Sequence, residues 1–390
     1  MDVYQEALDL FDYTQALRRD FHAHPELGFH EVRTAAVVAK ELSKLGLEIA
    51  TGIAETGVVA VLEGEKPGPV VLLRFDMDGL PIEEETGAEY ASQQPGVMHA
   101  CGHDGHTAIG LTVAKLLHAH QDQLAGTVKF VFQPAEEGLG GAERMIEEGV
   151  LNNPKPDYCL ALHLVNKSPL GVIGVSSEEV MAAAKAFKIE IEGEGGHGAL
   201  PHLTVDPIMA MAHFLTAAQT IVSRNLNPLD SGVVSFGRVR GGNAFNVIPS
   251  KVEIEGTLRA YKPMVADLIL NRLQEILHGV AQSLGCQATF AITDVTPAVY
   301  NTPAIAERLQ RIAQRVLPQD HLDTDLRMMW SEDMAFIMQG AQSCYFFIGS
   351  MNAEAGFHYG HHHPKFDFDE QAMPRGVALM TAAVCDILKE

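Results

Sequence analysis

Residues 96–108, GVMHACGHDGHTA, place one cysteine, three histidines and one aspartate between His99 and Thr107. Cys101 and His103 stand two positions apart, directly after a turn that contains glycine. A thiolate and an imidazole are both good ligands for divalent metals of borderline softness. The same two side chains could instead act as a nucleophile and its base, or the segment could be a polar loop rich in histidine. The rest of the chain has to decide among these three interpretations.

A pair of adjacent carboxylates follows the apolar run KFVF in the segment QPAEEG. These residues, Glu136 and Glu137, stand where a predicted strand ends, which is where open α/β sheets place their ligands. Side by side at a buried strand end, two carboxylates need a cation or a proton to be tolerated. One of them could bind a metal while the other acts as a base. The alternative is an exposed acidic loop, which explains the pair Glu147–Glu148 better.

Histidines stand in two further places. His163 ends the apolar run LALHL, where a lone histidine is usually a core residue with one hydrogen bond. Near the C-terminus, FHYGHHHPKFDFDE contains His361, His362 and His363 ahead of a proline. Taken with Cys101, His103 and the two glutamates, these side chains could bind one or two divalent metals. Two metals that share a ligand can clamp and activate a water molecule for hydrolysis.

The elements that must position these residues alternate along the first 180 positions. Short β-branched runs such as VVAVLEG and PVVLLRFDMDGL predict strands, whereas residues 3–20 and EVRTAAVVAKELSKLG predict helices. GHTAIGLTVAKLLHAH predicts a helix that begins inside the cysteine–histidine segment. Strands alternating with helices indicate an α/β sheet with helices packed on it.

The pattern changes near residue 180. Runs over residues 181–296 predict the order β-α-β-β-α-β, which is typical of a ferredoxin-like α+β sandwich. We therefore expect a larger domain, residues 1–180 and 297–390, that is interrupted by a smaller domain, residues 181–296. A chain of 390 residues is long enough for two cores.

Composition narrows the classes of partner. The net charge is −22, from 28 basic and 50 acidic residues, so a basic footprint for nucleic acid or anionic membranes is absent. No run approaches the roughly 18 apolar residues of a membrane helix, and the N-terminus lacks the pattern of a signal peptide. Five widely spread cysteines argue against a disulfide framework. We expect a cytoplasmic protein with no nucleic-acid or membrane partner.

Taken together, the motifs resemble those of the metal-dependent amidohydrolases and peptidases that include aminoacylase, hippurate hydrolase, glutamate carboxypeptidase and the auxin-conjugate hydrolases. The resemblance is strongest to the hippurate hydrolase and auxin-conjugate branch and covers essentially the whole chain. Its motifs are HAHPELGFHE, LRFDMDGLPIEEETG, MHACGHDGHTA, QPAEEGLGGAERMIEEG, GGHGALPHLTVDPI, NVIPS, GTLRAY and HHPKFDFDE. It implies a zinc-peptidase-like catalytic domain, a mixed sheet flanked by helices, with the inserted domain as a lid that also dimerises.

The resemblance also implies a ligand set for two divalent metals, with Zn²⁺, Mn²⁺, Co²⁺ and Ni²⁺ all chemically suited. The bridging ligand would be Cys101, and the other ligands would be His103, Glu137, His163 and His362. His361 and His363 stay open as alternatives because the three histidines form a run. Most of the family has His-x-Asp where this chain has Arg74-Phe-Asp76. Asp76 is therefore expected to orient a ligand histidine.

The same resemblance implies the catalytic and substrate-binding roles. Glu136 would be the general base, and His197 would stabilise the oxyanion. Asn246 would lie near the substrate, and Arg259 would bind its carboxylate in bidentate fashion. Asn246 could instead only hold a turn, and Arg259 could be an edge-strand charge.

The function implied is hydrolysis of the amide bond of an N-acyl-L-amino acid by a homodimer or larger homo-oligomer. Lid closure would bring His197 and Arg259 to the metals, which predicts hinges near residues 180 and 296. A short-peptide carboxypeptidase or dipeptidase of the same family is the alternative. Two interpretations of another class are a thiol hydrolase that uses Cys101 and a non-catalytic binding module.

Overall fold

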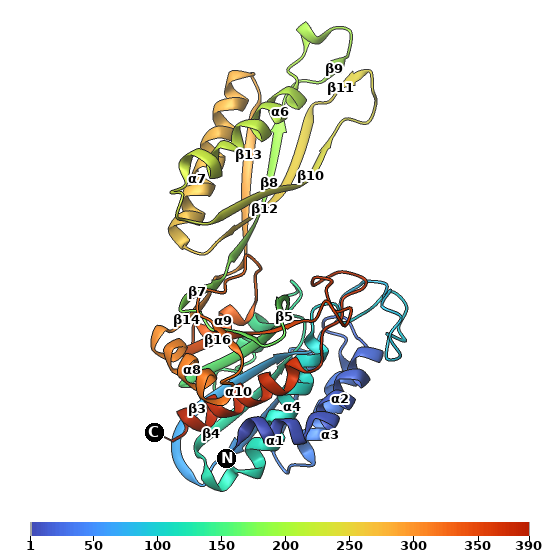
Figure 1. Cartoon of the computed structure of the whole chain (residues 1–390). Helices are drawn as coiled ribbons and strands as arrows, with labels where there is room; N and C mark the ends of the chain where they lie inside the picture. Colours follow the sequence, from blue (N-terminus) through green and yellow to red (C-terminus); the bar gives the residue numbers. More distant parts are fainter. Residues whose placement is uncertain (1, 390) are drawn as a thin grey trace. The chain divides into compact units, whose positions relative to one another are not determined.

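The computed structural model describes residues 2–389, which form two compact units (Figure 1). Unit 1 contains the chain up to Val180, together with Tyr300–Arg327 and the segment from Asp333 onward. Unit 2 contains Met181–Val299 and Met328–Glu332. Most of unit 2 is therefore one insertion in the sequence of unit 1. The short strands β7 (Glu178–Met181) and β14 (Val299–Asn301) lie where the chain passes between the units.

Unit 1 is built on an eight-stranded mixed sheet with the order β1-β2-β4-β3-β5-β16-β6-β15. Its central strands are parallel: β3 pairs with both β4 and β5, and β5 pairs with β16. The strands are β1 (Glu48–Ile53), β2 (Gly57–Glu63), β3 (Lys66–Asp76), β4 (Ala125–Gln133), β5 (Tyr158–Pro169), β6 (Val172–Gly174), β15 (His321–Asp323) and β16 (Gln342–Met351).

The central strands are nearly continuous apolar runs because they are buried on both faces. In β16, all residues from Ser343 to Ser350 are buried, and β4 is buried from Val128 to its end. The strands β1, β6 and β15 are short or part-exposed and lack such a run, so local sequence does not predict them. Strand β16 has such a run and was also missing from the predicted elements. The mixed sheet with flanking helices confirms the predicted fold class.

Helices pack on this sheet and on one another (Figure 1). Helix α4 contacts α2, α3 and α10 as well as strand β3, while α5 and α9 pack together. The helices are α1 (Val3–Asp9), α2 (Phe11–Ala23), α3 (Val32–Ser43), α4 (His103–Ala119), the 3₁₀ turn Gln121–Gln123, α5 (Gly141–Glu147), α8 (Pro303–Val316), α9 (Met334–Met338) and α10 (Ala372–Ile387).

The single helix predicted for residues 3–20 is two helices, α1 and α2, separated at Leu10. The break lets the two helices follow different partners, because α1 packs mainly on α10 and α2 packs mainly on α4. Packing partners of this kind cannot be deduced from the local periodicity of the sequence.

Unit 2 has its own four-stranded antiparallel sheet with the order β10-β12-β8-β13. Helices α6 and α7 pack on it and contribute to a separate apolar core. This is the predicted β-α-β-β-α-β arrangement. The elements are β8 (Ala183–Glu192), β9 (Gly196–His197), the 3₁₀ turn Pro201–Leu203, α6 (Pro207–Ala218), the π-helical turn Ile221–Asn225, β10 (Gly232–Gly241), β11 (Val247–Ile248), β12 (Lys251–Ala260), α7 (Pro263–Ser283) and β13 (Gln287–Thr296).

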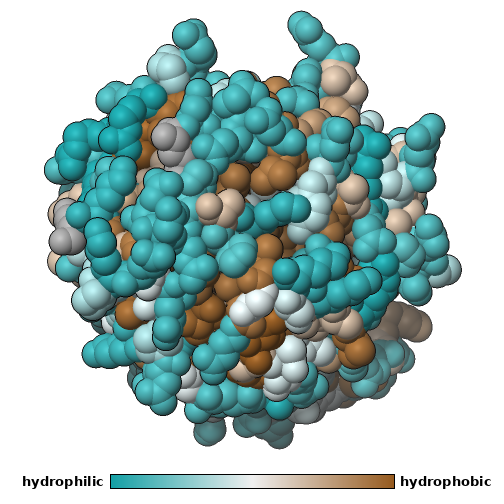
Figure 2. All heavy atoms as spheres, turned by 90° about the horizontal axis from the view of Figure 1, so that it is seen from below, coloured by the Kyte–Doolittle hydropathy of each residue, from teal (hydrophilic) through white to brown (hydrophobic). Residues whose placement is uncertain are grey.

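The surface in Figure 2 is mostly hydrophilic, with hydrophobic atoms visible in stretches between polar side chains. This distribution is ordinary for a folded chain, since apolar atoms contribute much of any protein surface. Within residues 2–389, none of the helices combines the length and hydrophobicity needed to cross a membrane.

Candidate metal centre

The side chains with ligand character gather where the central parallel strands end. Three overlapping sets of donor atoms are made up of the predicted ligands and Glu136, and within each set every donor lies within 4.8 Å of the others. These sets are Cys101–His103–His163, Cys101–Glu137–His362 and His103–Glu136–Glu137, and a further set joins His103 to Asp76 and His106. The set with His163 and the set with His362 share Cys101 alone, which is the position that a ligand shared by two metals would occupy.

Topology explains why residues so distant in sequence meet here. The parallel strands β3, β4 and β5 all direct their carboxyl ends to one edge of the sheet. Asp76 ends β3 and lies opposite Gln133, the last residue of β4, while His163 lies in the middle of β5. Helix α4 begins at His103, next to this edge. Imidazole, thiol and carboxylate side chains therefore lie together at this edge in one cluster.

His103 is held by a carboxylate that the sequence analysis did not select. Its Nδ1 lies 2.9 Å from the backbone oxygen of Asp78 and 3.1 Å from Asp78 Oδ1. An Nδ1–H that donates to these oxygens leaves the Nε2 lone pair for a metal. Within residues 2–389, His103 Nε2 is buried and has no hydrogen-bond partner.

The electrostatic environment of His103 favours positive charge. Burial opposes protonation of the ring, but the carboxylates of Asp76 and Asp78 raise the pKa of His103 to about 10. A pocket that stabilises a proton on this imidazole also stabilises a metal cation in the same place. The donors and the surrounding charge thus fit a divalent metal.

Asp76 has a different partner from the one expected. Its Oδ1 lies 2.6 Å from His106 Nδ1, and His106 Nε2 accepts a hydrogen bond from the Leu164 backbone N–H at 2.9 Å. Both nitrogens of His106 are therefore used within the fold. Asp76 Oδ2 stays 3.7 Å from His103 Nε2, so the carboxylate on His103 Nδ1 is Asp78, two positions later. Two acids separated by one residue at a strand end cannot be told apart by sequence position alone.

Arg74, which stands in place of the more common histidine, is buried beside Asp76. Its guanidinium donates to Asp76 Oδ2 at 2.6 Å, to Gln133 Oε1 at 2.8 Å and to Asp333 Oδ1 at 3.0 Å. Despite the burial of Asp76, the neighbouring His103, the hydrogen bond from His106 and the guanidinium of Arg74 hold its pKa well below the usual range. Arg74 therefore keeps Asp76 ionised instead of serving as a ligand.

His163 faces the cysteine. Its Nδ1 lies 2.7 Å from the Leu164 carbonyl oxygen, and its Nε2 lies 3.6 Å from Cys101 Sγ. The hydrogen bond at Nδ1 selects the tautomer in which Nε2 carries the lone pair. Burial, together with neighbouring His106 and His361, holds the pKa of His163 well below its usual range. A neutral imidazole is the form that binds metals.

The two glutamates lie on a strained turn. Ala135, immediately before them, has a φ of 56°, a left-handed conformation that is uncommon for a residue with a side chain. Its N–H donates to Glu31 Oε1 at 2.9 Å, and Glu31 Oε2 accepts from Thr56 Oγ1. Glu137 N donates to Asp78 Oδ2 at 3.0 Å. Strain of this kind persists where the surroundings fix it, which is common at functional sites.

The three C-terminal histidines have different environments. His361 Nε2 accepts from the Asn166 backbone N–H at 3.1 Å, and His363 Nδ1 accepts from Lys365 N at 3.0 Å. His362 Nε2 instead lies 3.2 Å from Glu137 Oε1. The φ of His362 is 64°, a second left-handed residue at the site. Of the three, His362, the residue chosen by the motif, therefore has a ring nitrogen beside the carboxylate of another predicted ligand.

The remaining candidates belong to unit 2. His197 is exposed on β9 opposite Val247, and its Nδ1 accepts from Ala199 N at 3.0 Å. The Asn246 backbone oxygen accepts from Gly198 N at 2.9 Å, which fits the role of holding a turn. Arg259 on β12 is half-buried, and its Nη1 donates to the Leu258 carbonyl at 3.2 Å.

Comparisons with known proteins give the family. The model of peptidase family M20/M25/M40 matches residues 72–386. The chain belongs to this family. It is 40% identical to the putative amidohydrolase YhaA of Bacillus subtilis, over 96% of this chain and 94% of that protein. It is 37% identical to IAA-amino acid hydrolase ILR1-like 4 of Arabidopsis thaliana, over 98% of this chain and 87% of that protein.

The fold agrees with a solved structure of the same family. The YXEP protein of Bacillus subtilis, described as a dinuclear metal binding peptidase from M20 family, superposes with a TM-score of 0.86 and 31% identity. The superposition covers 98% of this chain and 99% of that chain. These matches confirm the predicted resemblance and identify the chain as a hydrolase with the amidohydrolase or peptidase activity of this family.

Proposed function

We propose that this hydrolase cleaves the amide bond of N-acyl-L-amino acids and that two divalent metals are bound at the carboxyl edge of the unit 1 sheet. The observation that carries this proposal is the clustering of Cys101, His103, Glu137, His163 and His362, with Cys101 common to two of the donor sets. The names of the relatives support the substrate class, since one acts on indole-acetyl-amino acid conjugates and a structural neighbour is described as dinuclear.

The donors suit borderline metals. One sulfur, three imidazoles and a carboxylate match Zn²⁺, Mn²⁺, Co²⁺ or Ni²⁺, among which availability often decides. When bound, such metals would polarise the substrate carbonyl and lower the pKa of a coordinated water molecule. The buried Nε2 of His103 lacks a hydrogen-bond partner among residues 2–389, and metal binding would compensate for that cost.

Glu136 is the proposed general base. Its carboxylate lies in the set with His103 and Glu137, so it is beside the metal ligands without belonging to the cysteine-centred sets. It would accept a proton from the attacking water and deliver that proton to the nitrogen of the leaving amino acid. The adjacent position on the strained turn fixes Glu136 relative to Glu137.

The cysteine-nucleophile alternative fits the surroundings of Cys101 poorly. A reactive thiolate needs an electropositive environment that lowers its pKa. Burial and the carboxylates of Glu137 and Glu136 instead raise the pKa of Cys101 well above its usual range. A thiolate in such a place requires a cation, which favours the ligand role.

The roles proposed for unit 2 are substrate recognition and charge stabilisation. His197 would donate to the developing oxyanion, Asn246 would contact the substrate, and Arg259 would pair with the carboxylate of the amino acid. A free carboxylate next to the scissile amide is what distinguishes N-acyl amino acids from other amides, and the guanidinium matches it in bidentate geometry.

The first experiment combines metal content with activity. The protein would be purified without a His tag, and activity on N-acetyl-methionine and hippurate would be measured before and after chelation and after adding back Mn²⁺, Zn²⁺ or Co²⁺. We expect about two metals per chain and activity that is lost and restored with metal. Activity that resists chelation but is abolished by thiol alkylation would transfer the catalytic role to Cys101.

The role of Glu136 as general base is tested by comparing two variants. Glu136→Gln should lower kcat about 10²–10⁴-fold while the protein still binds metal. Glu147→Gln, an exposed glutamate on α5, should leave kcat unchanged. If Glu136→Gln keeps most of the rate with its metals in place, another group is the base.

The substrate class is tested at Arg259. Arg259→Met should raise KM for N-acetyl-methionine and have little effect on the uncharged N-acetyl-methioninamide. Arg238→Met, on the neighbouring strand β10 where Arg238 pairs with Glu255, is the control. An equal rise in KM for both substrates would show that Arg259 does not bind the substrate carboxylate.

A further inference from the structure

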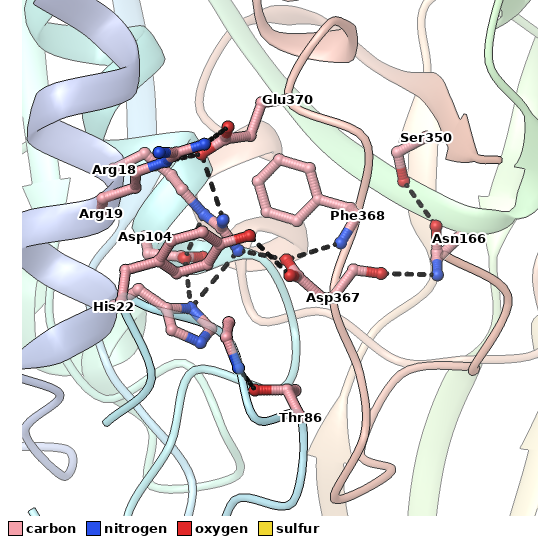
Figure 3. A network of polar contacts seen from close by, with 12 residues as sticks. Arg18, Arg19, His22, Thr86, Asp104, Asn166, Ser350, Asp367, Phe368 and Glu370 are labelled. Carbon is pink, nitrogen blue, oxygen red and sulfur yellow. Dashed lines mark hydrogen bonds and ion pairs between the residues drawn. The ribbon is translucent and has the colours of Figure 1, made fainter. Parts of the chain in front are cut away.

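One arginine outside the metal cluster is completely buried and contacts three carboxylates (Figure 3). Arg18 on α2 donates through Nε to Asp104 at 2.8 Å, through Nη2 to Asp367 at 2.6 Å and through Nη1 to Glu370 at 3.2 Å. Its guanidinium also lies 4.4 Å from the ring centroid of Phe368. Each nitrogen of the guanidinium therefore donates to a different carboxylate.

Two of these carboxylates belong to segments that present proposed metal ligands. Asp104 directly follows His103 in the first turn of α4, a helix whose N-cap is Gly102, with a φ of 92° and no side-chain cap. The contacts from Arg18 Nε and from His22 Nδ1, the latter at 2.7 Å, hold that turn instead. The start of the helix that presents His103 is thus fixed by residues from α2.

The second carboxylate belongs to the segment that presents His362. Asp367 lies five residues after His362, and besides Arg18 it accepts from Tyr90 Oη at 2.7 Å. Its backbone oxygen accepts from Asn166 Nδ2 at 2.9 Å, and Asn166 follows His163 along β5. One guanidinium therefore connects the segments that present His103 and His362, and a single further hydrogen bond reaches the strand of His163.

We propose that Arg18 is a positioning residue for the metal centre. By holding Asp104 and Asp367, it sets the distance between the start of α4 and the C-terminal histidine segment. The inference rests on the proposed metal site. Its physical basis is that His103 and His362 come from different segments, so their separation is not fixed by either segment alone. The rigid fork of arginine fixes two carboxylates at once, whereas a lysine ammonium is a single point charge.

A simple electrostatic role predicts something different. A positive charge close to a metal centre repels the metal, so Arg18→Lys, which keeps the charge, would leave metal affinity unchanged. The positioning role predicts weaker binding, because lysine cannot hold Asp104 and Asp367 together. Arg19 is the matched control, since it pairs with Glu370 at 2.6 Å and is 41% exposed.

The experiment titrates Co²⁺ into chelator-treated full-length protein and follows the thiolate-to-cobalt absorption, with the melting temperature of each variant measured in parallel. We expect Arg18→Lys to weaken Co²⁺ binding about 10-fold, at the lower end of the roughly 10- to 100-fold effect of losing a direct partner of a metal ligand, because Arg18 acts through Asp104 and Asp367. Arg19→Lys should change the affinity less than about twofold. A core variant of similar melting temperature, Val113→Ala on α4, should bind Co²⁺ like the wild type.

If folded Arg18→Lys binds Co²⁺ as tightly as the wild type, the inference is wrong. Equal weakening in Val113→Ala would also overturn it, because the effect would then follow stability alone. Should Arg18→Lys fail to fold, Asp367→Asn decides by the same titration, with weaker binding expected. A wild-type protein that binds no Co²⁺ would remove the proposed metal centre itself, a failure seen before any variant is compared.

Discussion

Both units have ion pairs at the surface, such as Arg33–Asp20 in unit 1, but unit 1 also has ion-pair networks in its interior. Arg18 and Arg74 of unit 1 are almost completely buried, and each donates to more than one carboxylate. In unit 2, Lys251 pairs with Glu190 at 2.9 Å and with Glu253 at 3.1 Å while its side chain is 38% exposed.

The comparison shows that a buried charge depends on its ion-pair partners far more than an exposed charge does. A buried arginine must be matched partner by partner, because removing one member leaves an uncompensated charge in a medium that solvates it poorly. On the surface, water and salt replace a missing partner. Replacing one charged side chain by methionine should therefore change the free energy of unfolding much more in the interior of unit 1 than on the surface of unit 2.

The largest effect is expected for Arg74→Met. This change leaves Asp76 and Asp333 buried without their cation, and we expect the free energy of unfolding to fall by about 3–5 kcal/mol. Urea unfolding of the metal-free protein measures this without interference from bound metal. A loss below about 1 kcal/mol would place Arg74 with the surface pairs instead.

The next effect concerns pH. Burial and the charge of Arg18 disfavour protonation of His22, but hydrogen bonds to Asp104 and Glu84 outweigh them and raise its pKa to about 9. A group whose folded pKa is raised contributes stability below its unfolded pKa, near 6.5, and loses it as the pH rises through the folded value.

We therefore expect the stability of the wild type to fall between about pH 6.5 and 9 relative to His22→Gln, by about 1.5–3 kcal/mol in total. Urea unfolding of both proteins across this range gives the difference. Parallel curves for the two proteins would mean that His22 is neutral in the fold.

Replacing a helical glycine by alanine should change stability in opposite directions in the two units. A Cβ on Gly110 of α4 would lie 2.5 Å from Phe75 Cδ2, whereas a Cβ on Gly279 of α7 would meet nothing within 4 Å. Gly110→Ala should destabilise unit 1 by about 1–3 kcal/mol, and Gly279→Ala should stabilise unit 2 by about 0.4–1 kcal/mol. Thermal unfolding of both variants checks the signs, and two changes of the same sign would contradict the packing.

The smallest effect is expected for Lys251→Met. Its carboxylate partners, Glu190 and Glu253, are partly exposed and remain hydrated, so the loss should be about 0–1 kcal/mol and should shrink further at high salt. Denaturation at low and high ionic strength provides the measurement. A loss comparable to that of Arg74→Met would erase the distinction between the units.

Several features of the fold could be predicted from local sequence. The apolar runs that became β2, β3, β4 and β5, and the β-α-β-β-α-β order of unit 2, gave the fold class because each element is specified by its own residues. The separation of α1 from α2 and the short or part-exposed strands β1, β6 and β15 depend on neighbours, so periodicity does not encode them.

The site divides in the same way. Cys101, His103 and the two glutamates were selected because unusual residue types are crowded together at strand ends. Asp78, Glu31 and Arg18 were not, because their importance lies in what they touch. Arg18 and Asp367 are 349 positions apart, and no pattern in either segment reveals that they meet.

That separation has a consequence for the order in which the protein is made. Synthesis runs from the N-terminus, so all of residues 181–299 have left the ribosome before Asp367 and Glu370 exist. Until then Arg18 lacks two of its three carboxylates, and the fourth parallel strand, β16, is absent from the sheet. Unit 2 can fold while the chain is still growing. Unit 1 has to wait for the segment that contains His362, Asp367 and Glu370, so its proposed metal centre would be completed later than the fold of unit 2.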